Sequence, residues 1–570
     1  MIRFTSFNGS STKTSLSVIL SLVTLLGLAG CPPEKVWYVT PDGSGSGTSW
    51  SDAFGSIQDA VDAASAAGGG GVWVAAGTYT ATTNNVVIMA EHVHLYGGFA
   101  GTETERDERD WEKNETIIDG EGARRCVFAF RPSEVTPLDE VFDGEGALRC
   151  VYVHRADDGV LDGFVIQNGY VAFSDGGGML NLASSPTVTN CTFAGNDAGN
   201  DGGGMCNYSS SPTVTNCTFA ENTASGPIGG GMFNYSSSPT VTNCTFTENT
   251  ASSGGGMCNF CSSPTVTNCT FTENASSDCG GGMSNSSSLP TVTNCTFTGN
   301  SAYGGGGMWN DSSSSPAVTN CTFTGNTGSG IVNFDSSPTV INCMFAENTT
   351  LIGGGGMYNG DSSPTVIDCT FAKNAGNNGG GGICNSRSSP MVTNCTFTEN
   401  TAYTGGGMWN SSSSPTVTNC TLTKNIASDH GGGMYNWQSL PMVTNCTFAE
   451  NTASYGGGMY NYDDSSPTVT NCILWSDSAS SSGNEIRNSD STSTPVVTYS
   501  CVEGGHTGMG NISSDPLFVD AANGDYSLQY GSPCIDAGTS DGVPDTDIEG
   551  TERPQGSGYD MGAYEYVAAR

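Results

Sequence analysis

Basic residues are scarce in this chain. Its 570 residues include 17 Lys and Arg against 55 Asp and Glu, which gives a formal net charge of −38. Contacts to phosphate need a basic surface, so this balance argues against nucleic acid as a partner. It also argues against direct binding of an anionic polysaccharide unless cations bridge the two molecules.

Long apolar runs are also rare, and the clearest one is at the start of the chain. Arg3 and Lys13 precede an apolar run over residues 16–28, which is short for a membrane span and suits a signal peptide. The run ends Leu-Ala-Gly-Cys at Cys31, which resembles the lipobox of bacterial lipoproteins. That resemblance implies cleavage before Cys31 and its lipidation. The alternative is an ordinary signal peptide with a chance cysteine, and in either case we expect export to a compartment that permits disulfides.

Glycine is abundant, with 80 residues, and most of it belongs to a repeat. One copy covers residues 405–425 and reads GGGMWNSSSSPTVTNCTLTKN, and the unit recurs twelve times between residues 176 and 475. The copies align on cysteines spaced 25 to 27 residues apart, with one step of 22. These column cysteines are Cys191, Cys217, Cys244, Cys269, Cys295, Cys321, Cys343, Cys369, Cys395, Cys420, Cys446 and Cys472.

The repeat predicts a parallel β-helix with one coil per unit. A period of this length is typical of a solenoid, in which no unit buries its apolar face alone. Each unit has three short extended pieces, GGMxN, TVT and CTF, separated by Ser, Pro, Asn or Gly. No part of the unit has the pattern of a helix, which disfavours helical and leucine-rich repeats.

Four columns of the repeat are predicted to face inward: methionine, valine, cysteine and phenylalanine. The residue before each cysteine is Asn, or Asp at Asp368, and must turn the chain. Asn tolerates the left-handed conformation, and stacked amides can hydrogen-bond from coil to coil. Large length changes fall between the Phe column and the next Met, which predicts a surface loop there.

The remaining segments flank the repeats. Residues 36–85 predict an N-terminal cap of strand, helix and strand, in which the helix covers about residues 56–66 with Ser56 as its N-cap. Residues 86–175 predict irregular coils and residues 476–514 one last coil. Residues 515–570 form a separate block that is predicted to cap the C-terminal end.

Residues 36–570 resemble the bacterial right-handed parallel β-helix surface proteins of the pectin-lyase-like superfamily. The block from Asp515 to Tyr566 is similar to their choice-of-anchor Q regions, and the GGGM and FTxN motifs are similar to the repeats of polymorphic outer membrane proteins. The resemblance implies the fold. It does not imply one activity, because the superfamily contains lyases, hydrolases and epimerases beside noncatalytic surface proteins.

Catalytic residues are hard to find in the repeats. Lyases of this fold need a strong base, commonly with calcium held by carboxylates, and hydrolases need two convergent carboxylates. Between residues 176 and 475 the basic residues are Lys373, Arg387, Lys424 and His430, and none falls on a predicted strand beside acids. An enzyme would therefore have its site in the irregular coils, for example among His92, His94 and Arg155.

Aromatic residues recur at the position after the column methionine, which is predicted to face outward. A sugar ring can stack on aromatic faces of this kind, and the alternative is that they only stabilise a parallel ladder. The carbohydrate-contact candidates are Phe233, Trp309, Tyr358, Trp409, Tyr435 and Tyr460.

Outward threonines of the TVT pieces resemble the flat faces of ice-binding solenoids, but Ala317, Ile341, Ile367, Met391 and Met442 interrupt the array. The strand propensity of threonine is the alternative explanation.

Two further groups of residues are candidates for cross-links or cations. Cys126 and Cys150 are a disulfide candidate, whereas the column cysteines are predicted to be buried thiols. Asp545, Asp547 and Glu549 could hold calcium through oxygen ligands, and an ordinary acidic turn is the alternative.

Together these features predict an exported, lipid-anchored, monomeric β-helix at the outer membrane or cell surface. It would act without catalysis or cofactor in adhesion or carbohydrate contact, and touch the membrane only through its anchor. The alternative is a polysaccharide lyase or glycoside hydrolase with its site in the irregular coils.

Overall fold

The computed structural model describes residues 34–130, 157–226, 228–351 and 353–568. The predicted leader with Cys31 lies outside these residues, as do Cys150 and Arg155.

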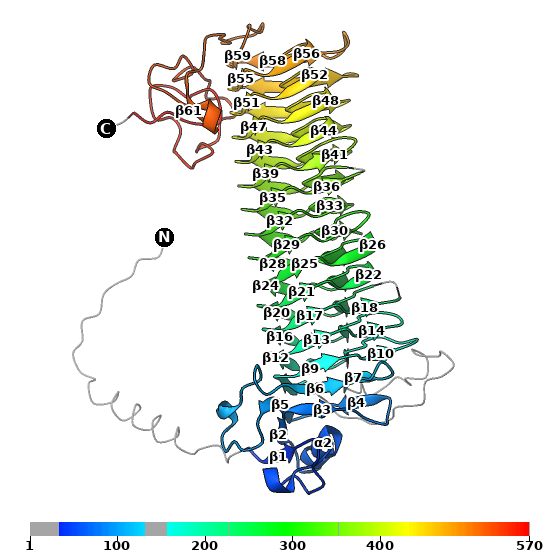
Figure 1. The fold of residues 1–570 in the computed structure, drawn as a ribbon. Coiled ribbons are helices and arrows are strands. Elements are labelled where there is room, and N and C mark those ends of the chain that lie inside the picture. Colours follow the sequence, from blue (N-terminus) through cyan, green and yellow to red (C-terminus); the bar gives the residue numbers. More distant parts are fainter. Residues whose placement is uncertain (1–33, 131–156, 227, 352, 569–570) are drawn as a thin grey trace, which may run out of the picture.

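The chain winds into one long solenoid of stacked coils (Figure 1). A typical coil contains β45 (Met408–Ser411), β46 (Thr416–Thr418), β47 (Thr421–Thr423) and β48 (Ile426–His430). Each of these strands pairs in parallel with a strand of the next coil, namely β49 (Met434–Trp437), β50 (Met442–Thr444), β51 (Thr447–Ala449) and β52 (Thr452–Tyr455). The predicted parallel β-helix is confirmed.

Three long sheets form the walls of the solenoid, and we name each after its core residue. The Met sheet runs from β4 (Asn85–Ile88) to β57 (Ile486–Asn488), the Val sheet from β1 (Val36–Val39) to β58 (Val496–Thr498), and the Phe sheet from β3 (Gly77–Tyr79) to β59 (Cys501–Val502). Within the described residues they contain 15, 17 and 16 strands. The pairing keeps equivalent residues in register, as with Val417 and Val443.

The four predicted core columns fill the interior. In a typical coil, Met408, Val417 and Cys420 are all 0% exposed, as is Leu422, which stands in the Phe column. Phenyl rings of neighbouring coils stack face to face, with centroids 4.7 Å apart for Phe219 and Phe246. The column cysteines are buried and unpaired. The thiol of Cys420, for example, donates to the carbonyl oxygens of Thr418 at 3.2 Å and Val392 at 3.6 Å.

The asparagine before each column cysteine turns the chain, as predicted. Asn216 and Asn243 both have φ of +54°, in the left-handed region. The Asn243 side-chain amide donates to the side-chain oxygen of Asn216 at 3.2 Å, and this bond repeats along the solenoid. The ladder begins at Asp162, whose carboxylate accepts from Asn190 at 2.9 Å and pairs with the buried Arg109.

Two further asparagine ladders lie inside the solenoid, and the sequence analysis did not identify them. One follows the Met column, where Asn410 donates to Asn436 at 2.9 Å. The other follows the Phe column, where Asn425 donates to Asn451 at 2.9 Å and to the Phe397 carbonyl at 3.0 Å. All five of these residues are 0% exposed, so the ladders satisfy polar groups that water does not reach.

The segment between the Phe column and the next Met is not simply a surface loop. In most coils it contains a short strand that pairs with the equivalent strands of neighbouring coils. These strands form two small sheets, which together we call the loop sheet. One part has five strands, from β10 (Tyr170–Val171) to β26 (Ala275–Cys279), and the other six, from β36 (Thr349–Thr350) to β56 (Ser478–Ser482). These strands are held by backbone hydrogen bonds between coils, which form with any side chain. A regular apolar pattern is therefore not needed in them.

Glycine is needed where the loop sheet turns into the Met sheet. Gly405 has φ of +64°, in the left-handed region. A Cβ atom on Gly406 would lie 2.6 Å from the carbonyl oxygen of Gly432 in the next coil. The glycine triplet therefore permits close contact between backbones.

The predicted helix lies across the N-terminal end of the solenoid (Figure 1). It is α2 (Ile57–Ala66), and the hydroxyl of Ser56 accepts from the backbone N–H of Asp59 at 3.3 Å. The side chains of Ile57, Ala60, Val61 and Ala64 face the core, in agreement with the predicted helical face.

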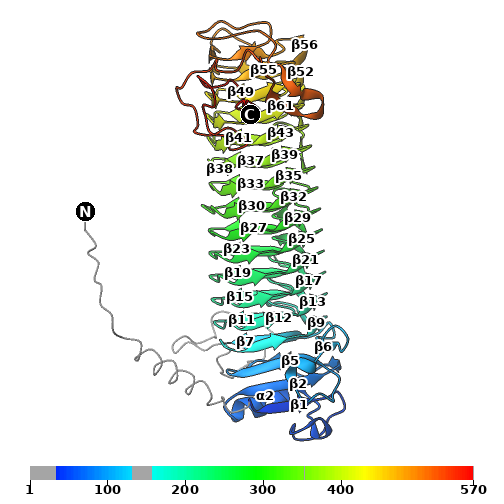
Figure 2. The same cartoon turned by 90° about the vertical axis from the view of Figure 1, so that its left-hand side faces the viewer.

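The C-terminal block, by contrast, packs on the side of the last coils and not across their end (Figures 1 and 2). Its backbone carbonyls accept from asparagines of the turn ladder, as between Asn419 and Thr546 at 2.6 Å and between Asn471 and Thr539 at 2.8 Å. Each of these two amides therefore donates both to the ladder and to the block. Among the described residues, no helix is long and apolar enough to cross a membrane.

Candidate functional site

The six aromatic candidates do not form one exposed platform. Phe233 is 1% exposed and Tyr460 is 7% exposed, whereas Trp309, Tyr358, Trp409 and Tyr435 are half-buried. The loop sheet and the glycine turn fold over this column. In the lower coils it becomes a second buried cluster, formed by Leu180, Cys206, Phe233 and Cys258. The expectation of outward exposure is therefore wrong for Phe233 and Tyr460, which are both buried.

In the upper coils the same column forms a continuous stack. The Trp409 and Tyr435 rings are 6.4 Å apart and inclined by 6°. The Tyr435 and Tyr460 rings are 5.6 Å apart and inclined by 9°. These three residues come from β45, β49 and β53 (Met459–Tyr462), so parallel pairing sets their spacing.

His430 joins this stack from the loop sheet. It ends β48, and its ring lies 4.3 Å from the ring of Tyr460 and 5.3 Å from that of Tyr455. Its Nδ1 atom lies 3.0 Å from a carboxylate oxygen of Asp429. We call the following group the His430 cluster: Tyr403, Asp429, His430, Tyr435, Tyr455 and Tyr460.

The His430 cluster is partly open to solvent. The side chains of His430 and Asp429 are 25% and 28% exposed, and Tyr403 and Tyr455 are 54% and 37% exposed. Burial raises the pKa of Tyr435 to about 12, so this hydroxyl stays neutral. A hydrogen bond to Asp429 raises the pKa of Tyr403. The cluster thus presents aromatic faces, neutral hydroxyls and one carboxylate together.

The sequence did not indicate His430 as part of a site. Counting backward from the glycine triplet places Thr404, His430 and Tyr455 at one position. The structure pairs these three residues in register. Variation in loop length hides this alignment, and the glycines would have shown it.

Two other basic residues of the repeats also lie beside acids, although on turns and not on strands. The Arg387 guanidinium bonds both carboxylate oxygens of Asp361, at 2.7 and 2.6 Å. Lys373 lies 3.8 Å from Glu399. Both pairs are exposed on turns, where such contacts contribute little stability.

A second, smaller aromatic group lies lower on the solenoid. Phe334 lies between Trp309 and Tyr358, with ring centroids 5.5 and 5.4 Å away. The indole N–H of Trp309 donates to Asp311 at 3.0 Å. This group has no histidine, and its rings are tilted by 38° and 47°.

The predicted alternative site in the irregular coils is only partly described. His92 pairs with Asp158, and His94 lies 2.8 Å from Glu34. The Asp158 contact raises the pKa of His92, first through the hydrogen bond and then through the charge. Each histidine thus has its own carboxylate. Arg155 lies outside the described residues.

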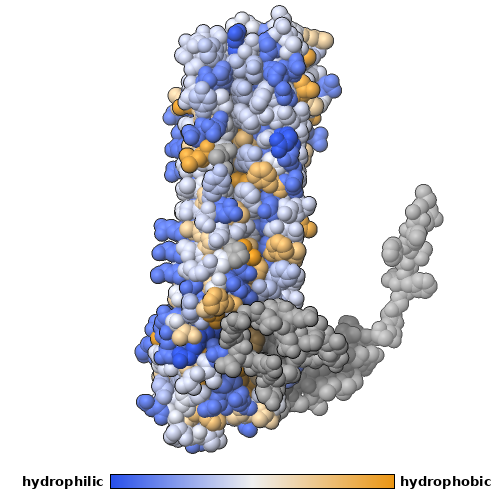
Figure 3. Space-filling model, turned by 90° about the vertical axis from the view of Figure 1, so that its right-hand side faces the viewer, coloured by the Kyte–Doolittle hydropathy of each residue, from blue (hydrophilic) through white to orange (hydrophobic). Residues whose placement is uncertain are grey.

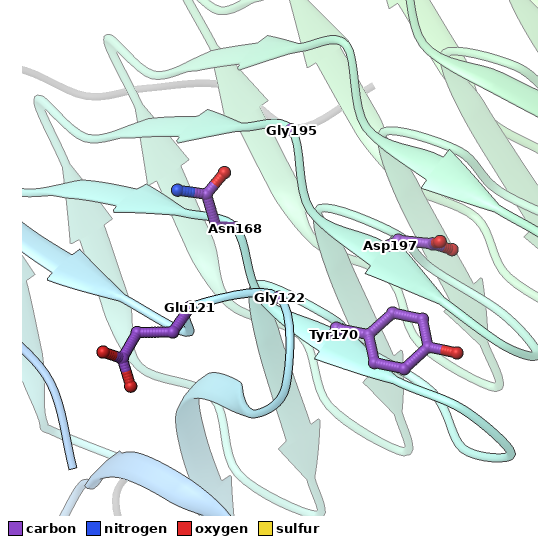
Figure 4. Close-up of a pocket in the computed structure, with 7 residues that line it drawn as sticks. Glu121, Gly122, Asn168, Tyr170, Gly195 and Asp197 are labelled. Atoms are coloured by element: carbon purple, nitrogen blue, oxygen red, sulfur yellow. The ribbon is translucent and has the colours of Figure 1, made fainter.

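An open pocket of about 420 Å³ lies near these coils, where the Phe sheet meets the loop sheet (Figure 4). Its acidic residues, Glu121 and Asp197, point away from one another, and Tyr170 projects outward. Glu121 is already paired with Arg124. The pocket therefore lacks two convergent carboxylates of the kind a glycoside hydrolase uses.

The structure describes all three residues of the calcium candidate but only one cysteine of the disulfide candidate. Asp547 is buried, and its carboxylate accepts from the backbone N–H groups of Glu549, Thr551 and Glu565. Asp545 and Glu549 are exposed on the turn. Within the described ranges, no group of three or more His, Cys, Asp or Glu side chains could hold a metal ion. Cys126 is buried, and its pairing with Cys150 stays a prediction.

Hydrophobic residues on the face that carries the loop sheet form separate spots along the solenoid and not one strip (Figure 3). Three of the exposed ones are Tyr303, Leu351 and Tyr403, at 69%, 75% and 54% exposure. The His430 cluster is therefore one local site on this face.

Comparison with known proteins gives the fold family. No curated protein matches the sequence. Among solved structures, pectate lyase Pel9A is 12% identical and aligns over 94% of this chain and 98% of its own, with a TM-score of 0.21. PfbA, a surface adhesin of Streptococcus pneumoniae, is 15% identical over 67% of this chain and 88% of its own, with a TM-score of 0.28. The A-module of the Azotobacter vinelandii mannuronan C-5 epimerase AlgE6 is 11% identical over 81% and 94%, with a TM-score of 0.22.

These likenesses are too distant to transfer an activity. The family model for the right-handed β-helix region, in contrast, matches residues 146–289, 251–371, 282–439 and 332–516, which together cover more than half of the chain. The matched ranges contain all twelve repeats and the coils on either side of them. The chain belongs to the right-handed β-helix family.

Proposed function

We propose that this protein contacts glycans at the cell surface through the His430 cluster, without catalysis. The observation that carries the proposal is the stack of Trp409, Tyr435 and Tyr460 beside the partly exposed His430 and Asp429. The apolar face of a sugar ring packs on aromatic rings, and its hydroxyls bond to carboxylates and phenols. The net charge of −38 favours neutral or cationic sugars over anionic ones.

A glycan array followed by titration calorimetry tests the proposal. We expect the full-length protein to bind neutral or amino-sugar glycans. His430→Ala and Tyr455→Ala should each weaken binding at least about tenfold, equivalent to about 1.4 kcal/mol. Tyr303→Ala is the matched control, because Tyr303 is an exposed tyrosine in the same kind of loop of a distant coil. Equal binding by all four proteins would contradict the proposal.

Export and lipid anchoring are part of the same proposal. The apolar run and the lipobox-like residues that end at Cys31 support them, as does the resemblance of the C-terminal block to choice-of-anchor Q regions. We expect wild-type protein from a bacterial host to fractionate with membranes and to carry a lipid on its N-terminal peptide in mass spectrometry. Cys31→Ala should release it from membranes, and an unmodified membrane-free wild type would contradict anchoring.

The second candidate function is that of a polysaccharide lyase or glycoside hydrolase, supported by the pairs His92–Asp158 and His94–Glu34. The test is incubation with uronate-containing and neutral polysaccharides, with new reducing ends and unsaturated uronates as readouts. Product formation that His92→Ala abolishes would favour this function over the binding proposal.

A further inference from the structure

The C-terminal block buries a small apolar cluster against the last coil. Its centre consists of Ile473, Cys501, Leu528, Cys534 and Met561. Two of these residues come from the solenoid and three from the block, so the cluster joins the two parts of the chain. It contains two cysteines that lie outside the column of twelve.

Cys501 faces outward because it stands one residue after the column-cysteine position, in an unbroken register with the preceding coil. Ser500 occupies the position of the column cysteine, and its hydroxyl accepts from the backbone N–H of Cys472 at 3.0 Å. Cys501 pairs with Ile473 of β55 (Ile473–Trp475), at the outward position of the Phe sheet. Neighbouring residues of a strand point to opposite faces. Cys501 therefore points out of the solenoid and toward the block.

Cys534 approaches the same point from the block. Its backbone oxygen accepts from Met561 at 3.0 Å, and its backbone N–H donates to the Ser532 hydroxyl at 3.2 Å. That hydroxyl donates to the carbonyl of Pro516 at 2.6 Å, two residues from Ser514. The Cys501 thiol donates to the carbonyl of Ser514 at 3.2 Å.

The two thiols are thus fixed around one short segment of backbone. Both are free thiols of the same buried apolar cluster, and both residues are 0% exposed. Burial places them in a closed, apolar site.

The column cysteines offer no comparable pair. Each thiol in the column is bonded to carbonyls, as Cys446 is to Thr444 at 3.3 Å, and all but the first and last have an equivalent neighbour both above and below. Parallel stacking points these side chains the same way, which does not suit disulfide geometry. Cys501 and Cys534 instead approach from opposite sides of an interface, and each has one partner.

We propose that Cys501 and Cys534 form a disulfide bond that ties the C-terminal block to the last coil. The oxidant is a disulfide, of a small molecule or of an oxidoreductase. Before the block docks, one thiolate attacks this disulfide, releases one thiol and forms a mixed disulfide. The second cysteine then displaces the other thiol. Two S–H bonds are lost, one S–S bond forms, and the oxidant takes up both electrons and both protons as two thiols.

Peptide mapping of the full-length protein tests this assignment. The protein is expressed in an oxidising compartment, or refolded with oxidised glutathione, then alkylated under denaturing conditions and digested without reduction. We expect mass spectrometry to find the Cys501 and Cys534 peptides linked to each other and the twelve column cysteines alkylated. Alkylation of both Cys501 and Cys534, or their linkage to column cysteines, would overturn the proposal.

A second measurement asks whether the bond has the proposed effect. Limited proteolysis should release the C-terminal block several-fold faster from Cys501→Ser and from reduced wild type than from oxidised wild type. Cys472→Ser is the matched control, because it removes a column thiol next to the same interface, and its oxidised form should resist proteolysis as wild type does. Equal release rates from oxidised and reduced wild type would contradict the proposed role. Neither readout depends on glycan binding, so this inference and the proposed function fail separately.

Discussion

At the scale of single residues, buried asparagines hydrogen-bond to one another in the interior of the solenoid. Asn410 accepts from the amide of Asn385 and donates to Asn436, each at 2.9 Å. It is 0% exposed, so no water replaces these bonds. A side chain that can both donate and accept is required at each position of such a ladder.

Asn410→Leu should therefore be strongly destabilising although leucine fills a similar volume. The donor of Asn385 and the acceptor of Asn436 would lose their partners, and each unsatisfied buried group costs about 1 to 3 kcal/mol. Denaturant titration followed by circular dichroism measures the change. Thr416→Ser, on the exposed face of the same coil, should change the midpoint little. An equal midpoint for both variants would contradict a role for the ladder.

A second buried polar site lies where one ladder ends. Asp477 takes the place of the next asparagine and accepts from the backbone and side chain of Asn451, both at 2.8 Å. Glu485 stands at a glycine position, and both carboxyl groups keep buried oxygens without a hydrogen-bond partner in the described part of the chain. Burial, and then the neighbouring carboxyl groups of Asp477 and Glu503, raise the pKa of Glu485. Burial raises the pKa of Asp477 to about 7.

The sign of the resulting pH dependence follows from these raised values. Below the unfolded pKa of Asp477, near 3.8, both states are protonated and the full stability is present. As the pH rises from there toward about 7, Asp477 loses its proton in the unfolded chain but keeps it in the folded protein. The free energy of unfolding therefore falls over this range. Asp477→Asn removes this dependence and restores the ladder. We expect it to stabilise the protein by about 1 to 3 kcal/mol at pH 8 and much less at pH 4.

Thermal unfolding at the two pH values measures this difference. Asp464→Asn, on an exposed turn of the same coil, is the control and should shift the midpoint equally at both. A gain from Asp477→Asn that is larger at pH 4 than at pH 8 would contradict the assignment.

At the scale of elements, the glycine turns let neighbouring coils approach closely. A Cβ on Gly432 would lie 2.5 Å from the carbonyl oxygen of Gly457 and 2.6 Å from that of Thr452. Both contacts are to backbone, which cannot move without separating strands. The turn therefore requires glycine because there is no room for a Cβ atom.

Gly432→Ala should lower the free energy of unfolding by about 1 to 3 kcal/mol, since it inserts a methyl group between two coils. Gly325→Glu is the control. Gly325 has φ of +63°, and a Cβ on it would have no atom within 4 Å, while the equivalent Glu347 and Glu399 have φ of +57° and +55°. Chemical denaturation should show a loss for the first variant and little change for the second. Equal loss in both would point to backbone conformation and not to space.

At the scale of the whole molecule, the solenoid is a sum of coils held by contacts with their neighbours. Each strand pairs with strands one coil before and one coil after, and the registers of successive coils agree. Stability in such an array is close to additive in the number of coils. Whole coils should therefore be removable, whereas fractions of a coil should not.

Deletion of residues 383–407 tests this property, because it joins Gly382 to Met408 and removes one complete coil. We expect a folded protein with the β-sheet circular dichroism of wild type and a similar unfolding midpoint. Deletion of residues 383–395 is the matched comparison, since it joins the glycine turn to the Phe sheet and breaks every register above it. Comparable folding of both deletions would contradict the additive description.

The sequence by itself determined the coil, its core columns and the turn asparagines. The recurrence of Met, Val, Cys and Phe, or of Ile and Leu in their place, indicates which side chains face inward, because alternate residues of a strand point to the same side. The helix at residues 57–66 was also predictable, from its N-cap and its apolar face. The inward asparagines could have been found from their fixed position in the repeat.

Only the tertiary structure decided which outward residues are exposed and where the ends pack. Phe233 and Trp409 occupy the same position of the repeat, yet Phe233 is buried and Trp409 is half-buried. His430 reaches the aromatic stack only because a loop pairs as a strand beside it, and Cys501 meets Cys534 only because the C-terminal block lies on the side of the solenoid. These contacts join segments of different coils. The periodicity of one coil carries no information about them, because exposure depends on what packs over a residue and not on the strand that holds it.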